Sequence, residues 1–259
     1  MTTLQTRNLK LSYSLSGPEG APVLLLSNSI ATTLAMWTPQ LSALQPHFRV
    51  LRYDTRGHGQ SEIPDGPYSI DQLGQDVLDL MDVLDVEKVH FCGLSLGGMT
   101  GMWLAAHHPS RIDKLVLSNC VPHIGNEAMW NSRIAQVLET GMEEIAAGQV
   151  GRWFRPGFEN SDPEAYRAAE LGIKQMLAQG YAGCCAVLRD ADLRTSLSGI
   201  AAPALVIGGQ YDLATPPEKT KQLASEIRAA KYAELPGGHL TNLDATEAFN
   251  AAVVQFLKE

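Results

Sequence analysis

One serine occupies the segment of the sequence with the clearest chemical meaning. Ser95 lies within GLSLG (residues 93–97), a G-x-S-x-G pattern. A strand-like apolar segment precedes it, and a helical segment, Met99–His108, follows it. A sharp strand-to-helix turn strains the serine backbone and crowds its neighbours, and the glycines at positions 93 and 97 relieve that crowding because they lack a Cβ. Such a turn also lifts the hydroxyl above the sheet. The context predicts a nucleophilic serine rather than a serine in an ordinary glycine-rich loop.

A serine hydroxyl attacks carbon only when a base takes its proton and a carboxylate orients that base. When the serine sits on such a turn, the carboxylate follows it in the sequence and the histidine comes last. Asp212 follows the apolar run Ala204–Ile207, and His239 follows the predicted strand Ala230–Leu235. Because parallel strands bring their carboxyl ends to one sheet edge, we predict a catalytic triad of Ser95, Asp212 and His239.

The negative charge that develops on the attacked oxygen needs two N–H donors. One is expected from Leu96, which follows the nucleophile. The other is expected from Ile30, in the loop after the apolar run Val23–Leu26. Among the other histidines, His58 precedes the serine and is predicted to support the site's floor or a turn. His123 opens the helical region described below and could face the cleft.

The elements around these residues alternate between strands and helices. Short apolar runs predict buried strands, and an apolar spacing of three and four over Ile70–Leu84 predicts an amphipathic helix. The alternation predicts an α/β fold with a mostly parallel, doubly wound sheet. Leu9–Leu15 alternates with polar residues and predicts an antiparallel edge strand. The remaining core elements are predicted at Trp37–Leu44 (helix), Arg49–Tyr53 and Lys114–Leu117 (strands), and Pro217–Arg228 and Asn242–Leu257 (helices).

The strand–helix alternation stops after Pro122. Only helical patterns follow until about Thr195, at Met129–Leu138, Met142–Val150, Pro163–Gln179 and Ala182–Leu188. We therefore expect residues 1–123 and 196–259 to form the core and residues 124–195 to be a helical insertion.

Composition restricts the function classes. The 259 residues carry a net charge of −8, which argues against nucleic acid or an anionic membrane surface as a partner. The four cysteines have neither disulfide-framework nor zinc-site spacing, and the N-terminus lacks an apolar signal core. The sequence indicates a cytoplasmic protein with reduced thiols and no metal. It leaves open whether the chain forms a homo-oligomer.

The motifs taken together resemble the α/β-hydrolase family. The resemblance is carried by YDTRGHGQS, GLSLGG, GGQYDLATPP and PGGHL. Most members have His-Gly in the loop after the first buried strand, where this chain has Asn28 and Ser29. In this replacement the chain resembles the 3-oxoadipate enol-lactonases of the β-ketoadipate pathway of aromatic breakdown. Three further motifs carry the same resemblance: RWFRPGF, AGCCAVLRDADLR and DLATPP.

This resemblance implies that the helical insertion is a cap over the cleft and that Ser95 opens a small, carboxylated enol-lactone without a cofactor. A free carboxylate on the substrate requires a cation in an otherwise acidic protein. Arg133, Arg152 and Arg155 are candidates. Arg133 is favoured because it follows Trp130 by three residues on a predicted helix, although an ordinary surface ion pair is an equal alternative. The implied substrate-binding residues are Arg133, Trp130, Trp153, Asn28 and Ser29.

Three other functions use similar residues. The first is a broader carboxylesterase or lactonase, and the second is a C–C bond hydrolase of ring-cleavage pathways. The third is a ligand-sensing protein with a slow triad. Steady hydrolysis of a lactone distinguishes an enzyme from a sensor, which would accumulate an acyl-enzyme without turnover.

Overall fold

The computed structural model describes residues 2–259. Met1, the first residue of the predicted core segment 1–123, lies outside the described residues. The strands are β1 (Thr2–Gln5), β2 (Lys10–Ser16), β3 (Val23–Ser27), β4 (Arg49–Tyr53), β5 (Val89–Leu94), β6 (Ile112–Ser118), β7 (Ala204–Gly209) and β8 (Lys231–Leu235). They form one sheet in the order β1-β2-β4-β3-β5-β6-β7-β8. The pairings β1–β2 and β2–β4 are antiparallel, and the others are parallel. The predicted mostly parallel α/β sheet is confirmed.

The antiparallel strand predicted over Leu9–Leu15 is confirmed as β2, but its predicted place at the sheet edge is wrong. β2 lies second in the sheet, because β1 pairs with it from Thr2 opposite Tyr13 to Gln5 opposite Lys10. β1 is four residues long and almost entirely exposed. It therefore has no buried face, and its sequence lacks the apolar alternation by which a strand is recognised.

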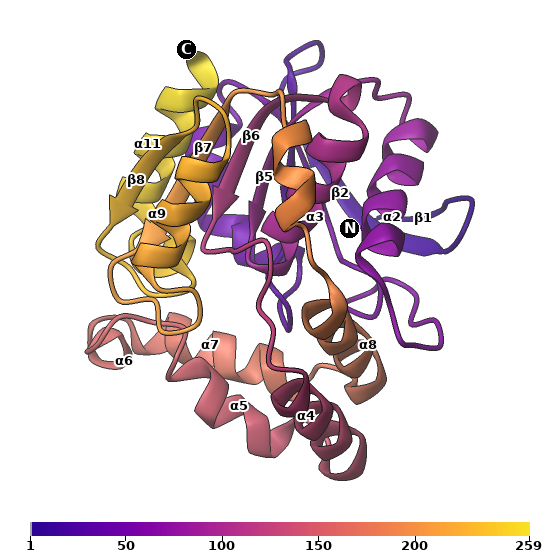
Figure 1. Ribbon diagram of the computed structural model, residues 1–259, viewed down its shortest axis with the longest axis vertical. Coiled ribbons are helices and arrows are strands. Elements are labelled where there is room, and N and C mark those ends of the chain that lie inside the picture. Colours follow the sequence, from indigo (N-terminus) through magenta and orange to yellow (C-terminus); the bar gives the residue numbers. More distant parts are fainter. Residues whose placement is uncertain (1) are drawn as a thin grey trace.

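Helices cover both faces of the sheet (Figure 1). One face carries α2 (Ile70–Val83), α3 (Leu96–His107) and α9 (Pro217–Glu226). The other carries α11 (Thr246–Lys258) with the short elements η1 (Leu34–Gln40), α1 (Leu41–Leu44) and α10 (Thr241–Asp244). Two short 3-10 turns, η2 (Pro109–Arg111) and η3 (Arg194–Gly199), complete the core segments.

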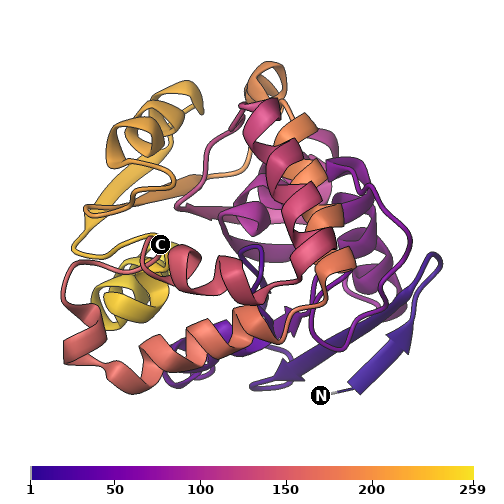
Figure 2. The same cartoon turned by 90° about the horizontal axis from the view of Figure 1, so that it is seen from below.

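Residues between β6 and β7 form the helices α4 (Glu127–Thr140), α5 (Glu143–Val150), α6 (Phe158–Ser161), α7 (Pro163–Lys174) and α8 (Ala178–Asp190). These helices gather at one end of the sheet, and Figure 2 views the molecule from their side. α4 packs against α8, and α5 packs against α7. Trp153, Phe158 and Ile173 are buried in the same hydrophobic cluster as the strands. The boundaries at 124 and 195 stay a prediction.

Two predicted helices are shorter than expected. The helix predicted over Pro163–Gln179 ends at Lys174, and the chain starts α8 at Ala178 after an extended residue, Leu177. The closing helix predicted over Asn242–Leu257 is interrupted at Ala245, whose φ of −131° and ψ of 42° are not helical. This interruption divides it into α10 and α11.

The cysteines are buried and unpaired. Over residues 2–259, no helix has both the length and the apolar character that a bilayer crossing requires.

Candidate active site

Ser95 lies at the junction of β5 and α3 in a strained backbone conformation. Its φ of 57° and ψ of −114° are unusual for a residue with a Cβ. Its N–H donates to the carbonyl oxygen of Ser118 at 2.9 Å, which ties the turn to β6. A Cβ on Gly93 would overlap the carbonyl of Gly97, and a Cβ on Gly97 would overlap the carbonyl of Ser27. The two glycines are therefore required for the turn that presents the serine.

Asp212 and His239 are brought together by the ends of neighbouring strands. Asp212 follows β7, His239 follows β8, and His239 Nδ1 lies 2.9 Å from Asp212 Oδ2. The same Oδ2 accepts hydrogen bonds from Asn119 Nδ2 at 2.9 Å and from Thr215 Oγ1 at 2.6 Å. Oδ1 accepts from the backbone N–H groups of Ala214 and Thr215. The carboxylate is therefore fixed in the orientation that holds the imidazole.

The charge of this carboxylate is also fixed. Burial by itself would raise the pKa of Asp212, but the charge of the His239 imidazole and the hydrogen bonds from both side chain and backbone lower it to about 2. Asp212 is therefore ionised near neutral pH. An ionised, oriented carboxylate beside Nδ1 keeps the proton on that nitrogen and leaves Nε2 available as a base.

Ser95 lies at the same sheet edge as this pair, because β5, β6, β7 and β8 are consecutive parallel neighbours. A chain of hydrogen bonds connects them. Ser95 N–H bonds to Ser118, and the next residue, Asn119, donates from Nδ2 to Asp212 and to the carbonyl of Gly238. Within residues 2–259, no hydrogen bond joins the Ser95 hydroxyl to His239. In serine hydrolases without substrate this contact is often long and tightens in the substrate complex.

Asn119 and Thr215 were not predicted as site residues. Asn119 is fully buried with a φ of 49°, and its Oδ1 accepts from the Ser118 hydroxyl at 2.6 Å. The available signal was its place directly after β6, at the edge shared by the triad strands. Thr215 lies three residues after Asp212, and both its N–H and its hydroxyl donate to that carboxylate.

The two predicted oxyanion donors are free of other partners. Within residues 2–259, neither the Ile30 N–H nor the Leu96 N–H forms a hydrogen bond. Leu96 is the first residue of α3, so its N–H has no acceptor in the helix. The adjacent Ala31 N–H, by contrast, donates to His58 Nε2 at 3.0 Å. Both free N–H groups thus stay available for a substrate oxygen, and their role stays a prediction.

His58 stabilises this loop instead of competing as a base. Its Nδ1 lies 3.1 Å from the carbonyl of Arg56, and its Nε2 accepts the Ala31 N–H, so the neutral ring is bound at both nitrogens. Burial lowers the pKa of His58 to about 4, which keeps the ring neutral. The expectation that His58 serves the floor of the site or a turn agrees with these contacts.

The two residues that replace His-Gly in this loop differ in their surroundings. Asn28 is fully buried, donates to the Tyr53 carbonyl at 2.8 Å and accepts from Trp37 Nε1 at 2.9 Å. Both ends of its amide therefore hold the loop to the core. The Ser29 hydroxyl is buried and has no hydrogen-bond partner within residues 2–259.

Arg133 and Trp130 both lie on α4, one turn apart. Arg133 Nη1 donates to Gln149 Oε1 at 3.1 Å and to the Tyr181 hydroxyl at 3.2 Å, and both acceptors are neutral. Within residues 2–259 Arg133 forms no salt bridge, so the surface ion pair considered above is not present. Trp130 Nε1 is buried without an acceptor in the same residues. On α4, the Arg133 guanidinium therefore has no counter-charge and the nearby Trp130 Nε1 has no acceptor within residues 2–259.

The other cap candidates are placed differently. Arg152 is exposed, and within residues 2–259 its side chain donates only to the carbonyl of Leu213, at 3.5 Å. Arg155 contacts the carbonyl of Asp244 and the hydroxyl of Ser161. Trp153 is 1% exposed and belongs to the hydrophobic core. Its side chain packs the cap onto the core.

A strained serine between strand and helix, followed by an acid after β7 and a histidine after β8, defines a class of protein. Residues 22–246 match the family model described as the alpha/beta hydrolase fold. The chain belongs to the α/β-hydrolase family.

Within that family the chain is similar to enol-lactonases. It is 40% identical over 256 residues to 3-oxoadipate enol-lactonase 2 of Acinetobacter baylyi, covering 99% of this chain and 96% of that protein. It is 36% identical to 3-oxoadipate enol-lactonase 1 of the same organism, covering 96% and 93%. The crystal structure of the enol-lactonase from Burkholderia xenovorans LB400 superposes with a TM-score of 0.98 at 42% identity, over 100% of both chains.

Proposed function

We propose that the protein is a serine hydrolase that opens 3-oxoadipate enol-lactone to 3-oxoadipate through an acyl-enzyme on Ser95. The observation that carries the proposal is the His239–Asp212 pair at 2.9 Å on the sheet edge that bears Ser95. It occurs in a chain with full-length similarity to enol-lactonases. Residues 124–195 form the cap over this site. The acidic chain with unpaired cysteines fits an enzyme of the cytoplasm.

The first half of the reaction forms an ester on the serine. His239 Nε2 takes the hydroxyl proton as Ser95 Oγ bonds to the ring carbonyl carbon, and Asp212 stabilises the imidazolium that results. The N–H groups of Ile30 and Leu96 bind the oxyanion. The ring C–O bond then breaks, and the leaving group is an enolate tethered to the far end of the acyl chain.

The second half frees the enzyme. The His239 imidazolium gives its proton to the enolate carbon, which forms a ketone and removes the nucleophile that would close the ring again. His239 Nε2 then takes a proton from a water molecule as the water oxygen bonds to the acyl carbon. It gives that proton to Ser95 Oγ as the Ser95–carbon bond breaks, which releases 3-oxoadipate. Every proton transfer uses His239, so the reaction needs no metal or organic cofactor.

The substrate's free carboxylate binds in the cap. Arg133 supplies the positive charge, and the unpaired Trp130 Nε1 supplies a donor one turn away on α4. The neutral partners of Arg133 orient its guanidinium without neutralising it. A carboxylate reaching this point adds the counter-charge that the cap lacks.

Steady-state turnover on three substrates tests the proposal: 3-oxoadipate enol-lactone, neutral butyrolactone and a simple aryl ester. The expected result is a kcat/KM for the enol-lactone well above those for the neutral substrates. Equal or higher values on the aryl ester would assign the protein to the broader carboxylesterases. An acyl-enzyme burst without turnover would assign it to ligand sensing.

A further inference from the structure

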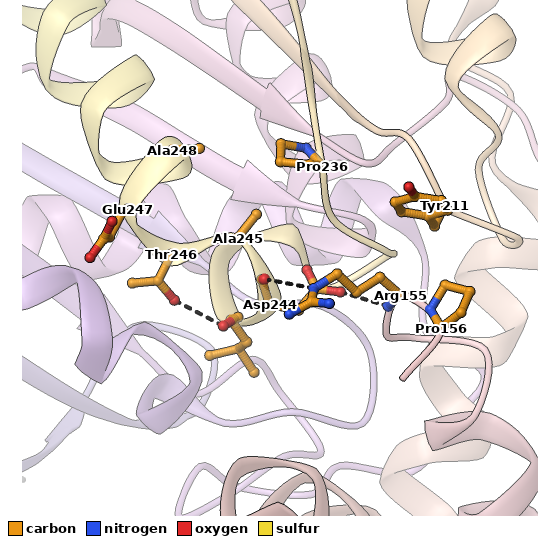
Figure 3. A pocket seen from close by; sticks show the side chains of 10 residues that line it. Arg155, Pro156, Tyr211, Pro236, Asp244, Ala245, Thr246, Glu247 and Ala248 are labelled. Atoms are coloured by element: carbon orange, nitrogen blue, oxygen red, sulfur yellow. Dashed lines mark hydrogen bonds between the residues drawn. The ribbon is translucent and has the colours of Figure 1, made fainter. Parts of the chain in front are cut away.

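The loop that carries His239 is bound to the cap through one carboxylate. Asp244 Oδ2 accepts the Gly238 N–H at 2.8 Å and the Arg155 N–H at 2.7 Å. Arg155 Nε in turn lies 3.4 Å from the carbonyl of Asp244. Figure 3 shows Asp244 and Arg155 side by side in the lining of a pocket, with dashed lines for the hydrogen bonds between them. Asp244 is only 9% exposed, so this link is inside the protein.

Other contacts place the cap on both sides of the histidine. The Leu240 N–H donates to the Trp153 carbonyl at 2.9 Å. A Cβ on Gly238 would lie 2.6 Å from that same carbonyl, so only glycine fits against the cap there. The residues before and after His239 thus both touch the segment Trp153–Arg155.

The core holds the same loop through its carbonyl groups, and the Tyr211 N–H donates to the Gly237 carbonyl at 2.9 Å. The Gly238 carbonyl accepts from Asn119 Nδ2 at 3.1 Å and from Thr241 Oγ1 at 2.6 Å. Its N–H depends on Asp244, which lies on α10 but also binds the cap. The charge strengthens both bonds, because N–H donors bind a carboxylate more strongly than a neutral acceptor. The backbone position of His239 is therefore set by core and cap together, with Asp244 as the shared acceptor.

We propose that Asp244 is a positioning residue that aligns His239 with Ser95 by joining the histidine loop to the cap segment Trp153–Arg155. The inference rests on the proposed role of His239 as the base and not on the identity of the lactone. When this link is broken, the imidazole shifts away from the serine although the triad residues are all present. The cap segment thereby helps to fix the position of His239, in addition to its proposed role in binding the substrate.

The first test measures the rate at which a fluorophosphonate labels Ser95, a reaction that needs the base but no lactone. Asp244→Ala is expected to slow labelling about 100-fold, the size of effect that a displacement of about 1 Å produces. Asp244→Asn keeps an oxygen acceptor for both N–H groups and is expected to restore most of the rate. A wild-type labelling rate in Asp244→Ala overturns the proposal.

A matched control separates positioning from general destabilisation. Asp79, on α2 and remote from the site, is also buried and accepts two side-chain hydrogen bonds, from Asn8 and Gln75, each at 2.7 Å. Asp79→Ala is expected to lower the melting temperature and leave the labelling rate unchanged. If Asp79→Ala slows labelling as much as Asp244→Ala, the effect is one of stability and the proposal is overturned.

A second variant breaks the link from the cap side and also serves if Asp244→Ala does not fold. Arg155→Pro removes the N–H that Asp244 accepts from the cap, at a position before Pro156 where extended backbone is already favoured. Arg155→Ala loses the same side-chain contacts to Asp244 and Ser161 but keeps that N–H, and it is the control for this variant. Arg155→Pro is expected to slow labelling and to speed amide hydrogen exchange at Gly238. Faster exchange at Gly238 with unchanged labelling overturns the proposal. If labelling follows these predictions while the wild type fails to open the enol-lactone, only the substrate assignment is lost.

Discussion

The Asp212 carboxylate stays charged although it is almost completely buried. A buried carboxylate remains ionised only when donors surround it, and here both of its oxygens are bound. In the proposed mechanism this charge stabilises the imidazolium that forms when His239 acts as the base. The chemistry of the site therefore depends on the donors around Asp212 as much as on the three predicted residues.

The charge of Asp212 has a consequence for acid stability. Folding lowers its pKa from 3.8 to about 2, so its ionised form stabilises the fold above about pH 4, and that contribution is lost as the pH falls towards 2. The difference in unfolding free energy between the wild type and Asp212→Asn should shrink by about 2 kcal/mol over this range. Urea unfolding of both proteins at several pH values measures it. A difference that does not change with pH would contradict the assignment of charge.

Arg133 is predicted to recognise the carboxylate of the substrate. Arg133→Ala should lower kcat/KM on the enol-lactone about 30- to 100-fold, because a hydrogen bond to a charged group contributes about 2–3 kcal/mol. The loss on neutral butyrolactone should be far smaller. Arg152→Ala, a change at an exposed arginine, is the control and should leave both substrates unaffected. Equal losses on the two substrates in Arg133→Ala would remove Arg133 from recognition.

The site residues that could be predicted from the sequence are those whose chain order and place after a strand are expected for a triad. Ser95, Asp212 and His239 each follow a strand in the expected order, so the sequence predicted where they lie. Asn119 was not predicted because its role depends on β6 pairing between β5 and β7, a neighbour relation that no local pattern reveals. The same limit applies to Asp244, because the Arg155 N–H that it accepts is distant in the sequence.

The loop after β3 is the element that places one oxyanion donor. It is held from inside by the amide of Asn28 and from the next loop by His58, which accepts the Ala31 N–H. Ala31 has a φ of 59°, a backbone conformation that residues with a Cβ rarely adopt, so contacts from neighbouring residues must hold the loop in this shape. The position of the Ile30 N–H therefore depends on His58.

His58→Ala should weaken oxyanion binding. It leaves the buried Ala31 N–H without an acceptor, at a cost of about 1–3 kcal/mol in stability. It should also lower kcat about 10- to 100-fold, less than the complete loss of an oxyanion donor. Stopped-flow kinetics and thermal unfolding measure the two effects. His123→Ala, which removes a single contact to the Ala191 carbonyl, is the control. A wild-type kcat in His58→Ala would show that the loop does not need the histidine.

Elements with an apolar run or an apolar face were predictable from the sequence, and those with neither were not. α2 begins at Ile70 as predicted, because Ser69 and Gln72 form a capping box ahead of its apolar residues. β1 exposes nearly all of its side chains, and α6 is a single turn, so neither has a periodic pattern. The break at Ala245 arises where Asp244 binds the cap, a tertiary contact that periodicity cannot record.

Across the whole molecule, the proposed function divides the work between the sheet edge, which carries the proposed triad, and the helices α4–α8, which carry the proposed carboxylate site. Trp153 and Phe158 belong to the same hydrophobic cluster as the strands, so the helices α4–α8 and the sheet share one continuous core. The proposed substrate selection by α4 and the proposed alignment of His239 through Asp244 would both depend on this packing. The predicted α/β architecture is confirmed, whereas the extent of the cap stays a prediction.

The measurement that tests the central claim most directly is turnover of 3-oxoadipate enol-lactone by the wild type and by Ser95→Ala. The substitution removes one buried hydroxyl, so circular dichroism and the melting temperature should stay close to those of the wild type. Because the triad acts as a unit, kcat/KM should fall about 10⁴- to 10⁶-fold. A folded Ser95→Ala protein that opens the lactone at near the wild-type rate would show that the acyl carbon is attacked by another group.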